Sequence, residues 1–195
     1  MPNYRRNVQG GATYFFTVVT HGRLTWLCSD AARAALRESI AEVRATRPFA
    51  VDAWVLLPDH LHCLWTLPAG DGDFSTRWRL IKSGVTKRLG TGGGASAEAD
   101  TPYRKTGFAG PMTQSRRRRG ERGVWQRRFW EHTIRDERDF ATHCDYIHFN
   151  AAKHGLVPAP RDWPWSTFHR FVQRGVYPSE WGRELPGVSV EIGGE

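Results

Sequence analysis

Hydrophobic and polar positions along the chain alternate between short runs typical of strands and longer repeats typical of helices. Three runs are rich in aromatic and β-branched side chains, and they cover residues 12–20, 49–57 and 60–67. Only Pro58 and Asp59 separate the last two runs, so they predict a tight hairpin. Residues 30–46 and 73–89 repeat apolar positions every three or four residues, which predicts two amphipathic helices.

The second half of the chain begins with a long break in this periodicity. Residues 91–123 contain a glycine-rich stretch followed by arginines, and we expect a flexible loop there. Residues 125–134 then resemble a strand, and residues 135–154 predict a helix that ends before a glycine and a proline. Residues 163–171 predict one short helix that packs against the body, followed by a frayed end.

The predicted order of elements is β, α, β, β, α, β, α. This order indicates an α+β fold with a ferredoxin-like βαββαβ antiparallel sheet and an additional C-terminal helix. We expect the helices to cover one face of the sheet and to leave the other face free. Residues 1–158 would form this domain, with residues 91–123 as an insert, and residues 159–195 would form an extension that packs on it.

Composition narrows the class of protein. Of the 195 residues, 39% are hydrophobic and 12% aromatic, which is typical of a folded chain. No stretch is long and apolar enough for a membrane span, and the N-terminus lacks the pattern of a signal peptide. We therefore expect a cytoplasmic, nucleoid-associated protein without a membrane partner. Three distant cysteines argue against a disulfide framework and against a cysteine-based zinc site.

The positive charge of the chain is concentrated in one segment. Residues 104–128 hold nine basic residues and one acidic residue, whereas the rest of the chain holds 19 of each sign. Such a segment is typical of an arm that binds a polyanion. The alternative is a solvated basic loop that binds nothing specific.

Two histidines at the start of the third strand form a candidate metal site. Side chains alternate across a sheet, so His60 and His62 project from one face and Leu61 from the other. Two imidazoles at this spacing can share a metal ion. An isolated pair of this kind is also compatible with surface or hydrogen-bonded histidines.

The helix predicted for residues 135–154 carries further candidates. A polar stripe lies about 60° to 140° from its apolar stripe at 100° per residue; it contains His143, Tyr146, Asn150 and Lys153. Because Tyr146 and Asn150 are one turn apart, they can point to the same place. If the helix packs beside the hairpin, Asn150 would add an oxygen ligand to the two imidazoles and Tyr146 would stand beside the metal. The alternative for Tyr146 is a place at the edge of the core.

Several separated segments resemble one family in the right order. They read MPNYRR, YFFTVVTHGR, WVLLPDHLHCLW, GVWQRRFWEHTIRDERDF, YIHFNAAKHGLV and DWPWS. They are similar to the REP-associated tyrosine transposases, relatives of the insertion-sequence-200-like single-tyrosine HUH transposases, from residue 1 to about residue 166. The resemblance implies that His60 and His62 bind a divalent metal, Mg²⁺ or Mn²⁺, that Asn150 is the third ligand, and that Tyr146 is the nucleophile.

Two departures from this family bear on the expected site. The family commonly has Asn-Pro where Asn150 is followed here by Ala151, so the helix is free to continue past the ligand. The insert at residues 91–122 matches no family motif.

Ligand preference by itself would suit Mn²⁺, Zn²⁺ or Ni²⁺ at two imidazoles and an amide oxygen.

The resemblance also implies a substrate and a reaction. Family members cut single-stranded DNA that folds into REP-type hairpins, through a 5′-phosphotyrosine intermediate, and the REP-associated branch is expected to act as a monomer. The expected DNA contacts are the basic residues Arg5, Arg6, Arg116, Arg117, Arg118, Arg119, Arg127, Arg128 and Lys153. Trp125 and Trp130 are candidates for base stacking or for the core. The alternative function is a non-catalytic or domesticated nucleic-acid-binding protein on the same fold.

Overall fold

The computed structural model describes residues 9–91, 114–118 and 123–183. The strands are β1 Thr13–Val19, β2 Ala50–Leu56, β3 His60–Thr66 and β4 Trp130–Thr133. The helices are α1 Asp30–Thr46, α2 Phe74–Thr91, α4 Gln114–Arg118, α5 Glu137–Lys153 and α6 Phe168–Gln173, with 3₁₀ turns η1 His21–Arg23 and η2 Pro160–Asp162. The order of the predicted elements is confirmed.

The strands form one antiparallel sheet in the order β2-β3-β1-β4. This is the strand order of a ferredoxin-like βαββαβ unit, so the predicted α+β class is confirmed. β1 and β3 are the central strands, and their register places Thr17 opposite His62. The hairpin across Pro58 and Asp59 forms as predicted, with Leu57 N donating to His60 O at 2.8 Å.

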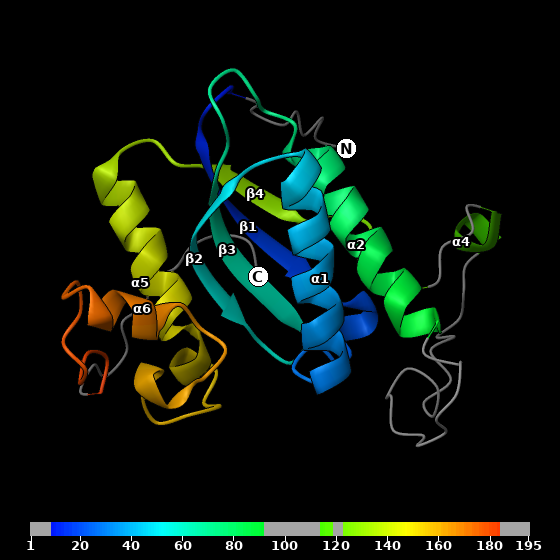
Figure 1. Cartoon of the computed structure of the whole chain (residues 1–195). Coiled ribbons are helices and arrows are strands. Elements are labelled where there is room, and N and C mark those ends of the chain that lie inside the picture. The colour runs from blue at the N-terminus through cyan, green and yellow to red at the C-terminus, as the bar shows by residue number, and fades with distance from the viewer. Residues whose placement is uncertain (1–8, 92–113, 119–122, 184–195) are drawn as a thin grey trace.

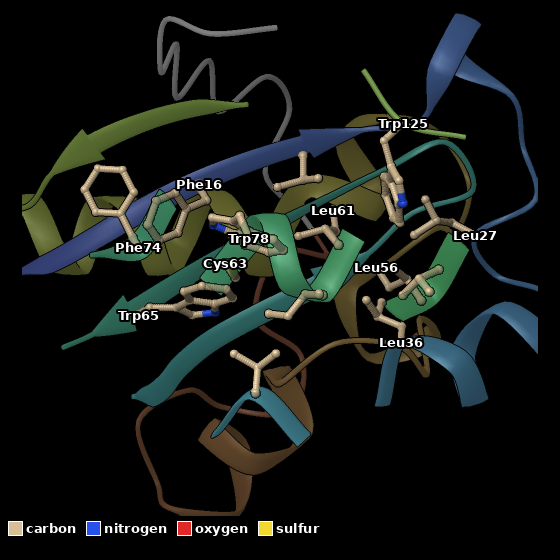
Figure 2. Packing of buried hydrophobic residues seen from close by; sticks show 14 of the residues in the cluster. Phe16, Leu27, Leu36, Leu56, Leu61, Cys63, Trp65, Phe74, Trp78 and Trp125 are labelled. Atoms are coloured by element: carbon tan, nitrogen blue, oxygen red, sulfur yellow. The ribbon is translucent and has the colours of Figure 1, made fainter. Parts of the chain in front are cut away.

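Helices α1 and α2 cover one face of the sheet (Figure 1). The Ser29 side chain caps the start of α1 by accepting from the Ala32 amide. Figure 2 shows the core beneath these helices, in which Trp65 of β3 stacks on Trp78 of α2 with ring centroids 4.1 Å apart. Leu61 points into this core, so the side chains of its neighbours in β3 point to the opposite face.

The opposite face is covered by α5, contrary to the expectation of a free face (Figure 1). This helix contacts β2 and β3, and its Ile147 packs with Phe15 and Leu64 of the sheet in a second hydrophobic cluster. Apolar side chains on both faces of the central strands require a cover on both faces. The Asp136 carboxylate starts α5 by accepting from the Asp139 amide at 2.8 Å.

The strand predicted at residues 125–134 is shorter in the structure. Only Trp130–Thr133 pairs with β1, whereas Trp125 makes an isolated bridge with Thr20. The Trp125 side chain is buried against Trp26 in the α1–α2 core, with ring centroids 5.3 Å apart. Between the two pairings Gln126 N still donates to Val19 O at 2.9 Å, and the Phe129 ring packs against Phe16 of β1, while Arg127 is exposed.

The segment after α5 packs along the edge strand β2. Leu56 N donates to Trp165 O at 2.9 Å, and Thr167 N donates to Trp54 O at 2.9 Å. The single helix predicted at residues 163–171 is therefore wrong in its first half, which pairs with β2 before α6 begins. None of the helices in the described ranges is long and apolar enough to cross a bilayer. Most of the predicted loop at residues 91–123 lies outside these ranges.

Candidate functional site

His60 and His62 lie side by side on the α5 face of β3, as their spacing predicts. Their ring centroids are 4.9 Å apart, and both side chains are buried. Burial lowers the pKa of His60 below its ordinary value, although the neighbouring Asp59 carboxylate opposes this shift. A neutral imidazole offers a nitrogen lone pair, which is the form that binds a metal.

Hydrogen bonds to the Nδ1 atoms fix the orientation of both rings. His60 Nδ1 lies 2.6 Å from Asp59 Oδ1, and His62 Nδ1 lies 2.9 Å from Thr17 Oγ1. These bonds leave Nε2 of each ring as the atom available for a ligand, and such partners commonly orient the histidines of metal sites. Although burial by itself raises the pKa of Asp59, the hydrogen bond from His60 and the Arg23 guanidinium hold it below its ordinary value.

Helix α5 brings Tyr146 to His62 and His154 to His60, and Asn150 lies one helical turn from each of these two α5 residues. The Tyr146 ring centroid lies 5.1 Å from that of His62. Asn150 is fully buried, and neither its Oδ1 nor its Nδ2 has a hydrogen-bond partner in the part of the chain that the structure describes. The same holds for Nε2 of His60. With Ala151 in place of proline, α5 continues to Lys153, so Asn150 lies within the helix.

The end of α5 adds two basic side chains to this cluster. Lys153 Nζ lies 4.9 Å from the centroid of the Tyr146 ring. The ring of His154, which caps the C-terminus of α5, lies 5.3 Å from that of His60. Lys153 was expected from its place on the polar stripe. His154 was not expected in this cluster, because the helical pattern ends at this residue.

The arginines expected to contact DNA are only partly described. Arg5, Arg6 and Arg119 lie outside the described residues. Arg116, Arg117 and Arg118 belong to α4, and Arg118 is exposed. Arg127 and Arg128 are exposed, and Arg127 Nη2 donates to Ser115 Oγ of α4 at 3.2 Å. Of the two candidate tryptophans, Trp125 is buried in the core and Trp130 is half-buried against Phe15.

A second polar cluster joins β4 to the start of α5. His132, Asp139 and His143 each offer one metal-ligand atom, and these atoms lie within 4.8 Å of one another. The three groups form a possible metal-binding triad. Helix periodicity places His143 on the polar stripe but does not connect it with His132, because that contact depends on how α5 sits on the sheet.

Comparisons with known proteins agree on one relationship. No sequence profile of a protein family matches the chain. The REP-associated tyrosine transposase of Escherichia coli (strain K12) is 41% identical over 189 residues, which are 97% of this chain and 96% of that protein. A relative of the same description from Haemophilus influenzae is 38% identical over 182 residues, 93% of this chain and 94% of that protein.

A solved structure supports the same relationship. It shows a REP-associated tyrosine transposase bound to a REP hairpin, at 40% identity and a TM-score of 0.73. The match covers 100% of this chain and 98% of that chain. Identity at this level over nearly the whole length shows that the chain belongs to the REP-associated tyrosine transposases.

Proposed function

We propose that this transposase cuts and rejoins single-stranded REP-like hairpin DNA through Tyr146, with a divalent metal held by His60, His62 and Asn150. The relative of known structure is bound to a REP hairpin, which supports the same kind of substrate here. One observation carries the proposal: the only tyrosine of α5 lies beside two buried histidines and a buried amide.

The donor atoms of the site fit a metal. A buried polar atom without a partner costs about 1–3 kcal/mol, so the unpartnered amide of Asn150 and Nε2 of His60 favour an occupant such as a metal ion. Two imidazoles and an amide oxygen are ligands that Mn²⁺ and similar divalent ions accept. When bound, the metal would polarise the scissile phosphate and stabilise charge on its oxygens. Mg²⁺ and Mn²⁺ are the ions that we propose for this site.

Tyr146 would supply the nucleophile. Its phenolic oxygen forms a bond to phosphorus as the bond from phosphorus to the 3′ oxygen breaks, which yields a 5′-phosphotyrosine and a free 3′-OH. The proton lost by the phenol balances the proton gained by the departing oxygen. The Lys153 ammonium, above the Tyr146 ring, would stabilise negative charge on the phenolate and the phosphate. Rejoining needs no ATP, because the new linkage keeps the phosphodiester energy.

We also propose that the chain acts as a monomer. Tyr146 lies beside His62 of its own sheet, which supports a site built within one copy of the chain. Arg118, Arg127 and Arg128 are exposed and would contact the DNA phosphates, together with the other arginines of the basic segment and with Arg5 and Arg6.

The test is a denaturing gel of the protein with labelled single-stranded hairpin DNA from its own genome, with and without Mn²⁺ or Mg²⁺. Wild type should form a metal-dependent covalent adduct, and Tyr146→Phe should form none while binding the hairpin with nearly unchanged affinity. Tyr14→Phe is the matched control, because Tyr14 is buried on the opposite face and the adduct should persist. His60→Ala should lose the metal-dependent cleavage.

Two results would contradict the proposal. An adduct that persists in Tyr146→Phe would place the nucleophile elsewhere. Hairpin binding by wild type without any adduct would favour a binding protein that has kept the fold without the reaction.

A further inference from the structure

The carboxylate of Asp139 connects three parts of the structure. Its Oδ2 accepts from the Arg135 amide at 3.0 Å and from Arg135 Nε at 3.1 Å, and it lies 2.8 Å from His132 Nε2. Asp139 is in the first turn of α5, His132 is in β4, and Arg135 is in the turn between them. This one side chain therefore fixes how the start of α5 sits on the sheet.

The contacts continue from this carboxylate to the proposed nucleophile. The His143 ring stacks on His132 with centroids 4.8 Å apart and planes 12° apart, and it packs against Phe15 at 4.9 Å. The Phe15 ring lies 5.5 Å from that of His62 and 5.8 Å from that of Tyr146. A shift of α5 at Asp139 would thus move Tyr146 relative to His62.

Hydrogen bonds and an ion pair connect the groups of this cluster. His143 Nδ1 lies 2.8 Å from the backbone oxygen of Asp139, so that nitrogen is a donor and has no lone pair for a metal, whereas the buried His143 Nε2 has no hydrogen-bond partner among the described residues. The Arg135 guanidinium already supplies a positive charge at the carboxylate. Parallel stacking of His132 and His143 also prevents both rings from directing in-plane lone pairs at one ion.

We propose that Asp139 and His132 are positioning residues that hold Tyr146 at the angle of attack on the phosphate. This inference rests on the proposed role of Tyr146 as nucleophile. A displacement of about 1 Å at a reacting atom can cost about 100-fold in rate. The Asp139–His132 bond acts on this angle from outside the site, since neither residue belongs to the proposed metal ligands.

The experiment compares two substitutions of His132 in the full-length protein. His132→Phe keeps a flat ring against His143 but removes the donor to Asp139, whereas His132→Gln keeps an amide donor of similar reach. The rate of adduct formation in a single turnover, the Kd for the hairpin and the Tm are measured for each. His132→Phe should slow adduct formation about 10- to 100-fold at saturating DNA with an unchanged Kd, and His132→Gln should restore most of the rate.

A control separates positioning from loss of stability. Ile81→Ala removes buried side-chain volume beneath α2, on the far face, and should lower the Tm without slowing adduct formation at a temperature where the protein is folded. Equal slowing in Ile81→Ala and His132→Phe would overturn the proposal. Recovery of the His132→Phe rate at high Mn²⁺ concentration would also overturn the proposal, because it would show that the cluster binds a metal ion. If wild type forms no adduct, the proposed function fails and not this inference alone.

Discussion

The two faces of the sheet differ in the chemistry of the side chains that they bury. The α1–α2 face buries aromatic and aliphatic groups such as Phe16, Trp65 and Trp78. The α5 face buries His62 and Asn150 among its apolar residues. Both faces are well covered, but among the described residues it is the second face that groups unpartnered imidazole and amide atoms, which are types of metal ligand. We therefore expect the first face to contribute mainly to stability and the second, which carries the proposed site, to contribute less.

The largest effect on stability is expected beneath α2. Trp78→Ala removes a fully buried indole that stacks on Trp65, and such truncations cost about 3–5 kcal/mol. Urea unfolding should show this loss in the free energy of unfolding. Tyr146→Phe, on the other face, should leave the free energy of unfolding nearly unchanged while it abolishes the adduct. Comparable losses in the two variants would refute the contrast between the faces.

A gain in stability is expected at the other face. Asn150→Leu replaces an amide without partners by an apolar group of similar size, and should raise the free energy of unfolding in EDTA by about 1–3 kcal/mol. Added Mn²⁺ should stabilise wild type more than the variant, because a ligand stabilises the state that binds it. A lower free energy of unfolding in EDTA would show that the amide is satisfied in the folded protein.

Acid should lower the free energy of unfolding through a buried histidine of α5. Burial lowers the pKa of His148 to about 3, whereas the pKa of a histidine in the unfolded chain is about 6.5. Between these values only the unfolded state binds the proton, so this group lowers stability by about 1.4 kcal/mol for each unit of falling pH. His148→Gln should make the plot of unfolding free energy against pH shallower from pH 6 to 4. An unchanged slope would contradict the shifted pKa.

The smallest effect is expected at the exposed ion pairs between α1 and α2. Arg88 Nε lies 2.9 Å from Glu38 Oε2, and the glutamate side chain is 62% exposed. Exposed pairs contribute about 0–1 kcal/mol, so Glu38→Gln should shift urea unfolding only slightly. A loss as large as that of Trp78→Ala would mean that charge, and not apolar packing, holds α2 to α1.

Local patterns in the sequence predicted most of the elements and the shared faces of the candidate site residues. Strand periodicity placed His60 and His62 on one face, and helix periodicity placed Tyr146 and Asn150 one turn apart. The partners of the histidines could be predicted only in part. Asp59 is a sequence neighbour of His60, whereas Thr17 reaches His62 through the register of β1 with β3, which no local pattern contains.

The remaining errors have a common physical cause. The strand predicted from Trp125 is interrupted because that side chain is drawn into the distant α1–α2 core, which outweighs local β propensity. The burial of the second face of the sheet by α5 and the hydrogen bond between Asp139 and His132 likewise depend on how α5 docks. Docking is decided by contacts between segments that are far apart in sequence.

The pairing of residues 165–167 with β2 has a consequence for the handling of the protein. An edge strand with free amides and carbonyls is a template on which other chains aggregate. Here Trp165 and Thr167 form backbone hydrogen bonds with the C-terminal half of β2. The segment after α5 therefore shields this edge, and its removal would expose unpaired backbone groups of β2 that promote aggregation.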